Sequence, residues 1–156
     1  MFKIVEKRNM QKINIIGISV RTSNNNGEAA RDIPELWAKF MNESILEKIH
    51  NKVDNTIYCL YTDYEKDYTM PYTTILGCAV NEMEELPEGM VSKTIEVENY
   101  QKFTAKGNIN EGVVFGEWMK IWNTDLNRAY TIDFEVYSEK ASDPSNAEVD
   151  IFIAVK

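Results

Sequence analysis

The residues of this sequence best suited to chemistry lie in the stretch YTIDFEVYSE, residues 130–139. It places Glu135 between Phe134 and Val136, in the most strand-like part of the chain. A carboxylate beside phenols such as Tyr137 can hold a cation, or it can orient a water and protonate a leaving group. The residue types alone do not choose between these two uses, because both need the same groups.

Period-two alternation predicts the side of a strand on which Glu135 would lie. One face would carry Tyr130, Ile132, Phe134 and Val136, and the other Thr131, Asp133, Glu135 and Tyr137. Taken alone, the pattern favours the second face as the solvated one, because glutamate is rarely buried without a compensating partner. The first expectation is therefore that Glu135 faces water.

Other sets of reactive side chains are incomplete. His50 is the single histidine and lies near the end of an expected helix, where a cap or an exposed position is its expected role. With one histidine and two separated cysteines, Cys59 and Cys78, we expect no zinc site, and a histidine-dependent triad could form only by recruiting His50. The acidic run DYEKDY at 63–68 lacks the features of a calcium loop and is interpreted as a solvated hairpin end. Glycine-rich nucleotide motifs are absent, and we expect no metal and no cofactor.

The composition is that of one acidic globular unit. With 156 residues and 44% hydrophobic content the chain can bury a core, so we expect one domain over residues 1–156. A formal net charge of −8 argues against direct nucleic-acid binding and suits a cationic small molecule. No apolar run approaches the ~20 residues of a membrane span, and no signal peptide is recognisable, so the expected location is the cytoplasm.

The elements that must position Glu135 occur in two similar sets. Strands or β-rich sequence are expected at 12–21, 56–64, 72–80, 91–107, 129–137 and 147–156. The first helix is expected to start at the capping box of Asp32 and Glu35, with Pro34 in its first turn, and to run to about Ile49. A second helix is expected in the segment VVFGEWMKIW, residues 113–122. Each half then has the order β-α-β-β.

The two expected helices carry apolar stripes that match at one constant shift in the sequence. The stripe residues Ile33, Leu36, Trp37 and Phe40 align with Phe115, Trp118, Met119 and Trp122. We interpret this match as an internal duplication, with repeats over about 1–82 and 90–156.

The duplication changes the expectation for Glu135. Superposing the third elements aligns YCLY with FEVY, so that Glu135 matches Cys59. Cys59 shares an apolar face with Ile57 and Tyr61, and the equivalent face of the second copy is then expected to point toward the interior. Asp133, which aligns with Ile57, departs from this pattern.

Four segments, IPELWAKF, YTDYEKDYTMPYTTILG, GEWMKIW and DFEVY, together resemble the GyrI-like, or AraC-type, effector-binding family of small-molecule-binding domains. The resemblance covers nearly the whole chain. It implies an α+β fold in which two β-α-β-β modules, related by a pseudo-twofold axis, form a curved antiparallel eight-stranded sheet with two main helices. It also implies a ligand cleft between the halves. Family members usually carry an N-terminal helix-turn-helix domain. The first expected element here is already a strand, so we expect a stand-alone effector-binding protein.

The resemblance also assigns roles to residues. In this family the glutamate of the FE pair in the seventh strand meets the positive charge of a bulky lipophilic cation, and that position is Glu135 here. A carboxylate in an apolar cleft is penalised by desolvation until an opposite charge arrives. Aromatic faces attract a desolvated cation by about 0.5–2 kcal/mol each. The expected ligand-binding residues are Glu135, Tyr137, Tyr61, Trp37, Trp118 and Trp122.

Two alternatives remain open at this point. Some GyrI-like relatives are hydrolases of reactive small molecules, and Glu135 with Tyr137 or Tyr61 could serve such a reaction. The gyrase-inhibitor name of the family suggests instead a module that binds a protein target. We rank small-molecule binding first, by a stand-alone protein that resembles the ligand-binding domain of multidrug-responsive transcription regulators.

Overall fold

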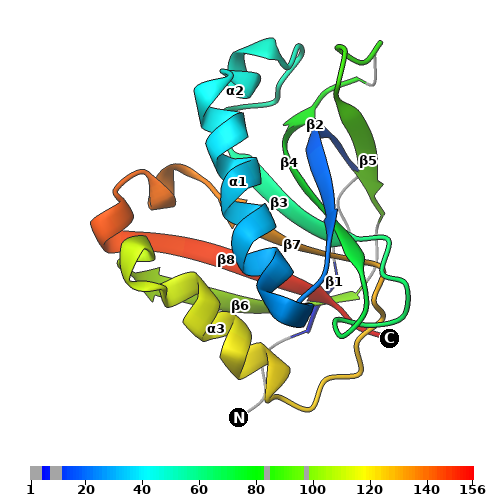
Figure 1. The fold of residues 1–156 in the computed structure, drawn as a ribbon, viewed down its shortest axis with the longest axis vertical. Helices are drawn as coiled ribbons and strands as arrows, with labels where there is room; N and C mark the ends of the chain where they lie inside the picture. Colours follow the sequence, from blue (N-terminus) through cyan, green and yellow to red (C-terminus); the bar gives the residue numbers. More distant parts are fainter. Residues whose placement is uncertain (1–4, 8–11, 83–84, 97–98) are drawn as a thin grey trace.

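The computed structural model describes residues 5–7, 12–82, 85–96 and 99–156 (Figure 1). Its strands are β1 (Val5–Lys7), β2 (Ile13–Thr22), β3 (Ile57–Thr62), β4 (Tyr72–Val80), β5 (Val91–Ile95), β6 (Asn99–Gly107), β7 (Ile132–Tyr137) and β8 (Ala147–Ala154). They form one antiparallel sheet in the order β1-β6-β8-β7-β3-β4-β2-β5. The helices are α1 (Glu28–Asn42), α2 (Ile45–Lys48) and α3 (Val113–Trp122). The α+β class and the antiparallel sheet expected from the sequence are confirmed.

The two long helices lie on the same side of the sheet. In Figure 1, α1 crosses the half that contains β2, β3 and β4, and α3 runs beside the half that contains β6 and β8. Leu36 and Phe40 of α1 pack on the first half, and Trp118 and Ile121 of α3 pack on the second. Burial of these apolar side chains holds each helix against its half, and β7 and β3 meet between them.

The opposite side of the sheet has its own core. Side chains that point away from the helices form a second buried cluster, including Ile15, Leu60, Ile75, Phe134 and Phe152. Phe134 stacks on Phe152 with ring centroids 5.0 Å apart, and Tyr100 meets both rings edge-on. The centre of the sheet is therefore covered on both sides.

The first helix differs from its expected bounds. It begins at Glu28 rather than Asp32, because Gly27 with φ 70 turns the chain in the left-handed conformation just before it. Asp32 is not the N-cap of this helix, although the capping box had predicted that role. Its carboxylate accepts a hydrogen bond of 2.9 Å from the Thr22 hydroxyl and ties α1 to the end of β2. Pro34 lies inside the helix. The helix ends at Asn42, and Ser44 with φ 52 separates it from α2.

The expected apolar stripes are only partly buried. Leu36 and Phe40 are buried, whereas Met41, Phe115 and Met119 are exposed. Helical spacing identifies the apolar residues, but the sheet covers a narrower strip of each helix than the spacing suggested.

The sheet order is symmetric about the β3–β7 pair. Strands β4 and β2 follow β3 outward, as β8 and β6 follow β7. The β-rich segment 91–107 forms two strands, and β5 joins β2 in the first half while β1 joins β6 in the second. The internal duplication and the extent of its two repeats stay predictions.

Candidate functional site

Strand β7 places its two acidic residues in the interior. Asp133 is 0% exposed and Glu135 is 2% exposed, so the expectation of a solvated face is wrong. The reason is the position of β7, which pairs with β3 on one edge and β8 on the other and lies beneath the two helices. Glu135 is the cross-strand partner of Cys59, and both belong to the interior, as the sequence match between them indicated.

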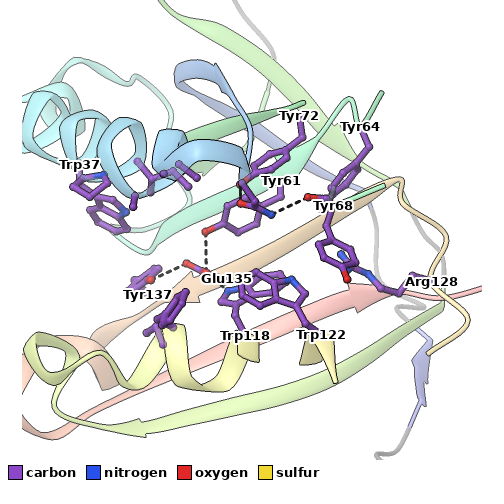
Figure 2. Close-up of a pocket in the computed structure, with 18 residues that line it drawn as sticks. Trp37, Tyr61, Tyr64, Tyr68, Tyr72, Trp118, Trp122, Arg128, Glu135 and Tyr137 are labelled. Atoms are coloured by element: carbon purple, nitrogen blue, oxygen red, sulfur yellow. Dashed lines mark hydrogen bonds between the residues drawn. The ribbon is translucent and has the colours of Figure 1, made fainter. Parts of the chain in front are cut away.

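Four neutral groups surround the Glu135 carboxylate: the Cys59 thiol and three donors labelled in Figure 2. The Tyr61 hydroxyl and the Trp118 indole N–H donate to Oε2 over 2.9 and 2.6 Å. The Tyr137 hydroxyl donates to Oε1 over 2.7 Å. The donors come from β3, α3 and β7, so the carboxylate joins the two halves of the fold.

Burial and hydrogen bonding act against each other on this group. Desolvation raises the pKa of Glu135, while the hydrogen bonds from Tyr137, Trp118, Tyr61 and Cys59 lower it, and the pKa remains above its usual value. None of the ion pairs in the described part of the chain includes Glu135. Its negative charge is stabilised by dipoles alone.

The phenols that donate to Glu135 are held in their neutral form. Burial raises the pKa of Tyr137 well above its usual value, and the charge of Glu135 raises it further. Burial likewise raises the pKa of Tyr61, and the neighbouring Cys59 and Glu135 add to the effect. Both hydroxyls therefore stay protonated and remain hydrogen-bond donors.

Glu135 lines a cavity of about 600 Å³ between α1 and α3. A volume of this size suits a drug-sized molecule. The wall is made by α1 and the segment before it, β3, β4 and their connection, α3, β7 and the segment before β7. It comprises Asn24, Gly27, Ala29, Ala30, Ile33, Pro34, Trp37, Tyr61, Tyr64, Tyr68, Tyr72, Val114, Phe115, Trp118, Trp122, Arg128, Glu135 and Tyr137. All six residues named from the sequence as ligand contacts are among them. That they bind a ligand stays a prediction.

Aromatic side chains of the wall pack against one another, two pairs of them edge to face. The Trp37 ring meets the Tyr137 ring with centroids 4.9 Å apart, and the Tyr61 ring meets the Trp118 ring at 5.3 Å. Trp122 continues the wall from Trp118, with 6.2 Å between ring centroids. Edge-to-face contacts fix the rings in place and leave aromatic surface turned to the cavity.

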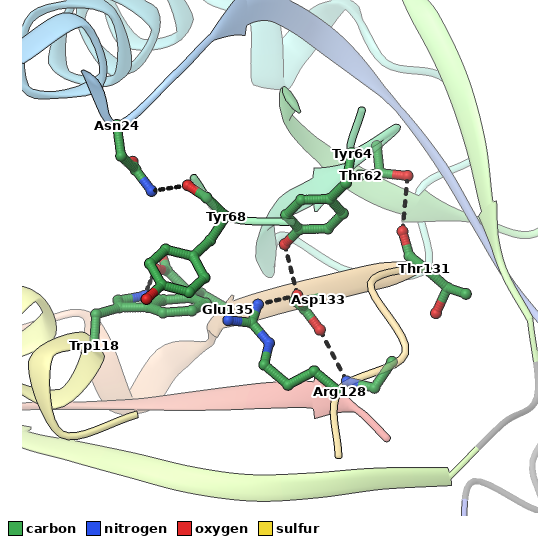
Figure 3. A network of polar contacts seen from close by, with 10 residues as sticks. Asn24, Thr62, Tyr64, Tyr68, Trp118, Arg128, Thr131, Asp133 and Glu135 are labelled. Carbon is green, nitrogen blue, oxygen red and sulfur yellow. Dashed lines mark hydrogen bonds and ion pairs between the residues drawn. The ribbon is translucent and has the colours of Figure 1, made fainter. Parts of the chain in front are cut away.

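Sequence reasoning missed a second polar cluster, centred on Asp133 (Figure 3). Its Oδ2 accepts from the Tyr64 hydroxyl at 2.6 Å and from Nη2 of Arg128 at 2.7 Å. Its Oδ1 accepts from the backbone N–H of Ala154 at 2.8 Å. Period two had placed Asp133 on the face of Glu135, but Arg128 lies in an irregular segment where no periodic pattern exists.

The ion pair with Asp133 keeps Arg128 charged in the interior. Burial lowers the pKa of Arg128, and the charge of Asp133 outweighs that effect and raises it. Burial and the Asp133 charge raise the pKa of Tyr64, which stays a donor. The negative charge of Asp133 is therefore balanced by Arg128, whereas the carboxylate of Glu135 has no positive partner among the described residues.

The hairpin end at 63–68 fits its interpretation only in part. Asp63 and Glu65 are exposed, and Asp63 pairs with Lys93 at 2.8 Å. Tyr64 and Tyr68 turn inward and line the cavity, so this run belongs to the site. His50 is exposed just after α2. Within the described ranges, no group of three or more histidine, cysteine or acidic side chains is placed to hold a metal ion.

No helix of the described residues is both long and apolar enough to cross a membrane.

Known proteins resemble this chain in both sequence and fold. Residues 3–155 match the family model Cass2, described as integron-associated effector binding protein. The candidate transcriptional regulator protein YobU of Bacillus subtilis (strain 168) is 31% identical over 144 residues, which cover 90% of each chain.

Two solved structures have a similar fold. An integron cassette protein from the mobile metagenome of Vibrio cholerae is 30% identical with a TM-score of 0.75, covering 98% of this chain and 95% of that one. The structure of SAV2435 bound to tetraphenylphosphonium has a TM-score of 0.79 at 16% identity, covering 100% of this chain and 94% of that one.

The family model spans nearly the full chain. YobU and the integron cassette protein each match this chain over at least 90% of their own lengths. The resemblance to GyrI-like effector-binding domains is thereby confirmed, and the chain belongs to the integron-associated effector-binding protein family.

Proposed function

We propose that this effector-binding protein holds lipophilic cations in the cavity between α1 and α3, with Glu135 as the counter-ion. The observation that carries the proposal is a carboxylate, 2% exposed, that lines an aromatic cavity and forms no ion pair among the described residues. A buried charge without a partner is unfavourable, and a ligand of opposite charge removes that cost.

The hydrogen bonds to Glu135 prepare it for this role. A carboxylate has about four lone-pair positions, and Tyr61, Trp118, Tyr137 and the Cys59 thiol all hydrogen-bond to it here. The donors fix the orientation of the group and favour its charged form. They are neutral, so the negative charge remains available to a ligand.

The aromatic wall supplies the rest of the recognition. Trp37 and Tyr137 lie toward one end of the cavity and Trp118 and Trp122 toward its middle (Figure 2). Aromatic faces attract cations without demanding one hydrogen-bond geometry, which suits ligands of varied shape. SAV2435, which shares this fold, has been solved with tetraphenylphosphonium bound, and that compound is the natural first probe.

The test is a calorimetric titration of the protein with tetraphenylphosphonium and other lipophilic cations, followed in parallel by tryptophan fluorescence. We expect saturable binding at one site per chain and a change in tryptophan emission, because Trp37, Trp118 and Trp122 all line the cavity. Absence of saturable binding across the cation panel would contradict the proposal.

A further inference from the structure

The Glu135 carboxylate leaves no acceptor position for an N–H group on a ligand. Tyr61 and Trp118 donate to its Oε2. Tyr137 donates to Oε1, and the Cys59 thiol also hydrogen-bonds to the group. An ionised carboxylate offers about four lone-pair positions, so the four protein donors match its capacity. Its negative charge can attract a ligand, but its hydrogen bonds are already made within the protein.

The rest of the cavity wall offers no second carboxylate. Among the described residues that line the cavity, Glu135 is the only acid. Asp133 is 0% exposed and lies outside the wall. The side-chain oxygen of Asn24 already accepts from the Tyr72 hydroxyl over 2.6 Å. The other side-chain oxygens of the wall are tyrosine hydroxyls, which are neutral and form weaker hydrogen bonds with a cation than a carboxylate does.

This saturation separates two kinds of lipophilic cation. An ammonium with N–H groups is strongly hydrated, and in the cavity it would lose that hydration without gaining a carboxylate acceptor. A quaternary ammonium or phosphonium has no N–H group to satisfy. The negative charge of Glu135 attracts it without direct hydrogen-bond contact, and the rings of Trp37 and Trp118 line the same cavity. The cavity therefore favours the second kind of cation.

Resting on the proposed function, we infer that the site selects permanently charged cations without N–H groups, and that Tyr137 is the residue that enforces this selection. Tyr137 lines the cavity, and its hydroxyl donates to Oε1 of Glu135 over 2.7 Å. Its ring is held edge-on by Trp37, with 4.9 Å between centroids. The hydroxyl thus fills the position on the cavity side that a ligand N–H group would need.

Removing that one hydroxyl should open the carboxylate to ammonium ligands. In Tyr137→Phe, Oε2 keeps its donors Tyr61 and Trp118, so Glu135 stays oriented. The lost phenol oxygen leaves a space of about one atom beside Oε1. The nitrogen of a ligand ammonium can take that place and donate a charge-assisted hydrogen bond.

The matched control is Tyr64→Phe. Tyr64 lines the same cavity, but its hydroxyl donates to Asp133 over 2.6 Å. Because Asp133 is 0% exposed, the position that this variant frees is closed to a ligand. Both variants remove one phenol oxygen from the wall, and only Tyr137→Phe frees an acceptor on Glu135.

The test compares two monocations with the same number of heavy atoms by calorimetry at pH 7. (Biphenyl-4-ylmethyl)trimethylammonium has no N–H group, whereas 1-(biphenyl-4-yl)-2-methylpropan-2-ammonium carries a protonated primary amine. We expect wild-type protein to bind the quaternary compound about tenfold more tightly. In Tyr137→Phe the ratio of the two affinities should shift by about tenfold toward the primary ammonium, and in Tyr64→Phe it should keep its wild-type value. Each probe has one positive charge, so a change in the ionisation of Glu135 alters both affinities equally and leaves the ratio unchanged.

Equal or tighter binding of the primary ammonium by wild-type protein would overturn the inference, and this result needs no variant to fold. A ratio that keeps its wild-type value in Tyr137→Phe, or that shifts as much in Tyr64→Phe, would overturn the assignment to Tyr137. Failure of tetraphenylphosphonium to bind wild-type protein is a separate result and contradicts the proposed function itself.

Discussion

Replacing Glu135 by glutamine removes the charge of the site and keeps its shape. In the structure Oε2 accepts from Tyr61 and Trp118, and the glutamine carbonyl can take its place. The amide NH₂ then faces the Tyr137 hydroxyl, which can rotate to accept a hydrogen bond. The side chain keeps its size and its hydrogen-bond contacts with Tyr61, Trp118 and Tyr137, so the change chiefly tests the effect of charge on ligand binding.

The size of the effect on binding follows from the burial of the site. Removing one partner of a buried charge pair costs about 2–5 kcal/mol of binding free energy. Four neutral groups already share the charge of Glu135, so we expect the lower part of that range, about 2–3 kcal/mol. The affinity for tetraphenylphosphonium should then fall by about 30- to 150-fold. A neutral compound of similar size, such as triphenylmethanol, should change by less than about threefold.

The same substitution should affect stability in the opposite direction. Burial raises the pKa of Glu135 in the folded protein above its unfolded value. Stability from this group is therefore present below the unfolded pKa and is lost as the pH rises through the folded pKa. Once ionised, the buried carboxylate destabilises the unliganded fold, and glutamine avoids that cost. We expect Glu135→Gln to melt at a higher temperature than wild-type protein when no ligand is present.

Calorimetric titration with both compounds, together with thermal unfolding of the unliganded proteins at pH 7, measures these effects. Equal loss of affinity for the cation and the neutral compound would refute the role of Glu135 as counter-ion. A lower melting temperature for the variant would show that the carboxylate serves the fold rather than the ligand, and the reasoning from its burial would be wrong.

Three further predictions follow from the same two carboxylates. Asp133→Asn should lower the free energy of unfolding by about 3–5 kcal/mol, because it leaves Arg128 buried without its counter-charge. Denaturant unfolding measures this loss, and a loss below about 1 kcal/mol would contradict the prediction. The affinity for tetraphenylphosphonium should rise with pH through the raised pKa of Glu135, since only the ionised form attracts the cation, and titrations from acidic to neutral pH should show this rise in wild-type protein but not in Glu135→Gln. Tyr137→Phe removes the hydrogen bond that lowers the pKa of Glu135 most, so the midpoint of that affinity curve should move to higher pH, and an unmoved midpoint would count against the hydrogen bond.

The local pattern of the sequence predicted much of this site. The apolar spacing of residues 113–122 predicted a helix at the bounds of α3. Period two placed Asp133, Glu135 and Tyr137 on one face of a strand, and the three side chains do share the interior side of β7. Both helix spacing and strand alternation depend on neighbours along the chain, which is why sequence alone was sufficient for them.

Whether that face meets water was decided by the tertiary structure. Alternation is the same for an exposed edge strand and a covered central one, and only the pairing of β7 with β3 and β8 beneath two helices excludes solvent from Glu135. Arg128 shows the same limit, because it reaches Asp133 from an irregular segment that no period describes. The sequence by itself thus determined which residues share a face. Burial and charge pairing arise from contacts between distant segments, and only the folded chain decides those.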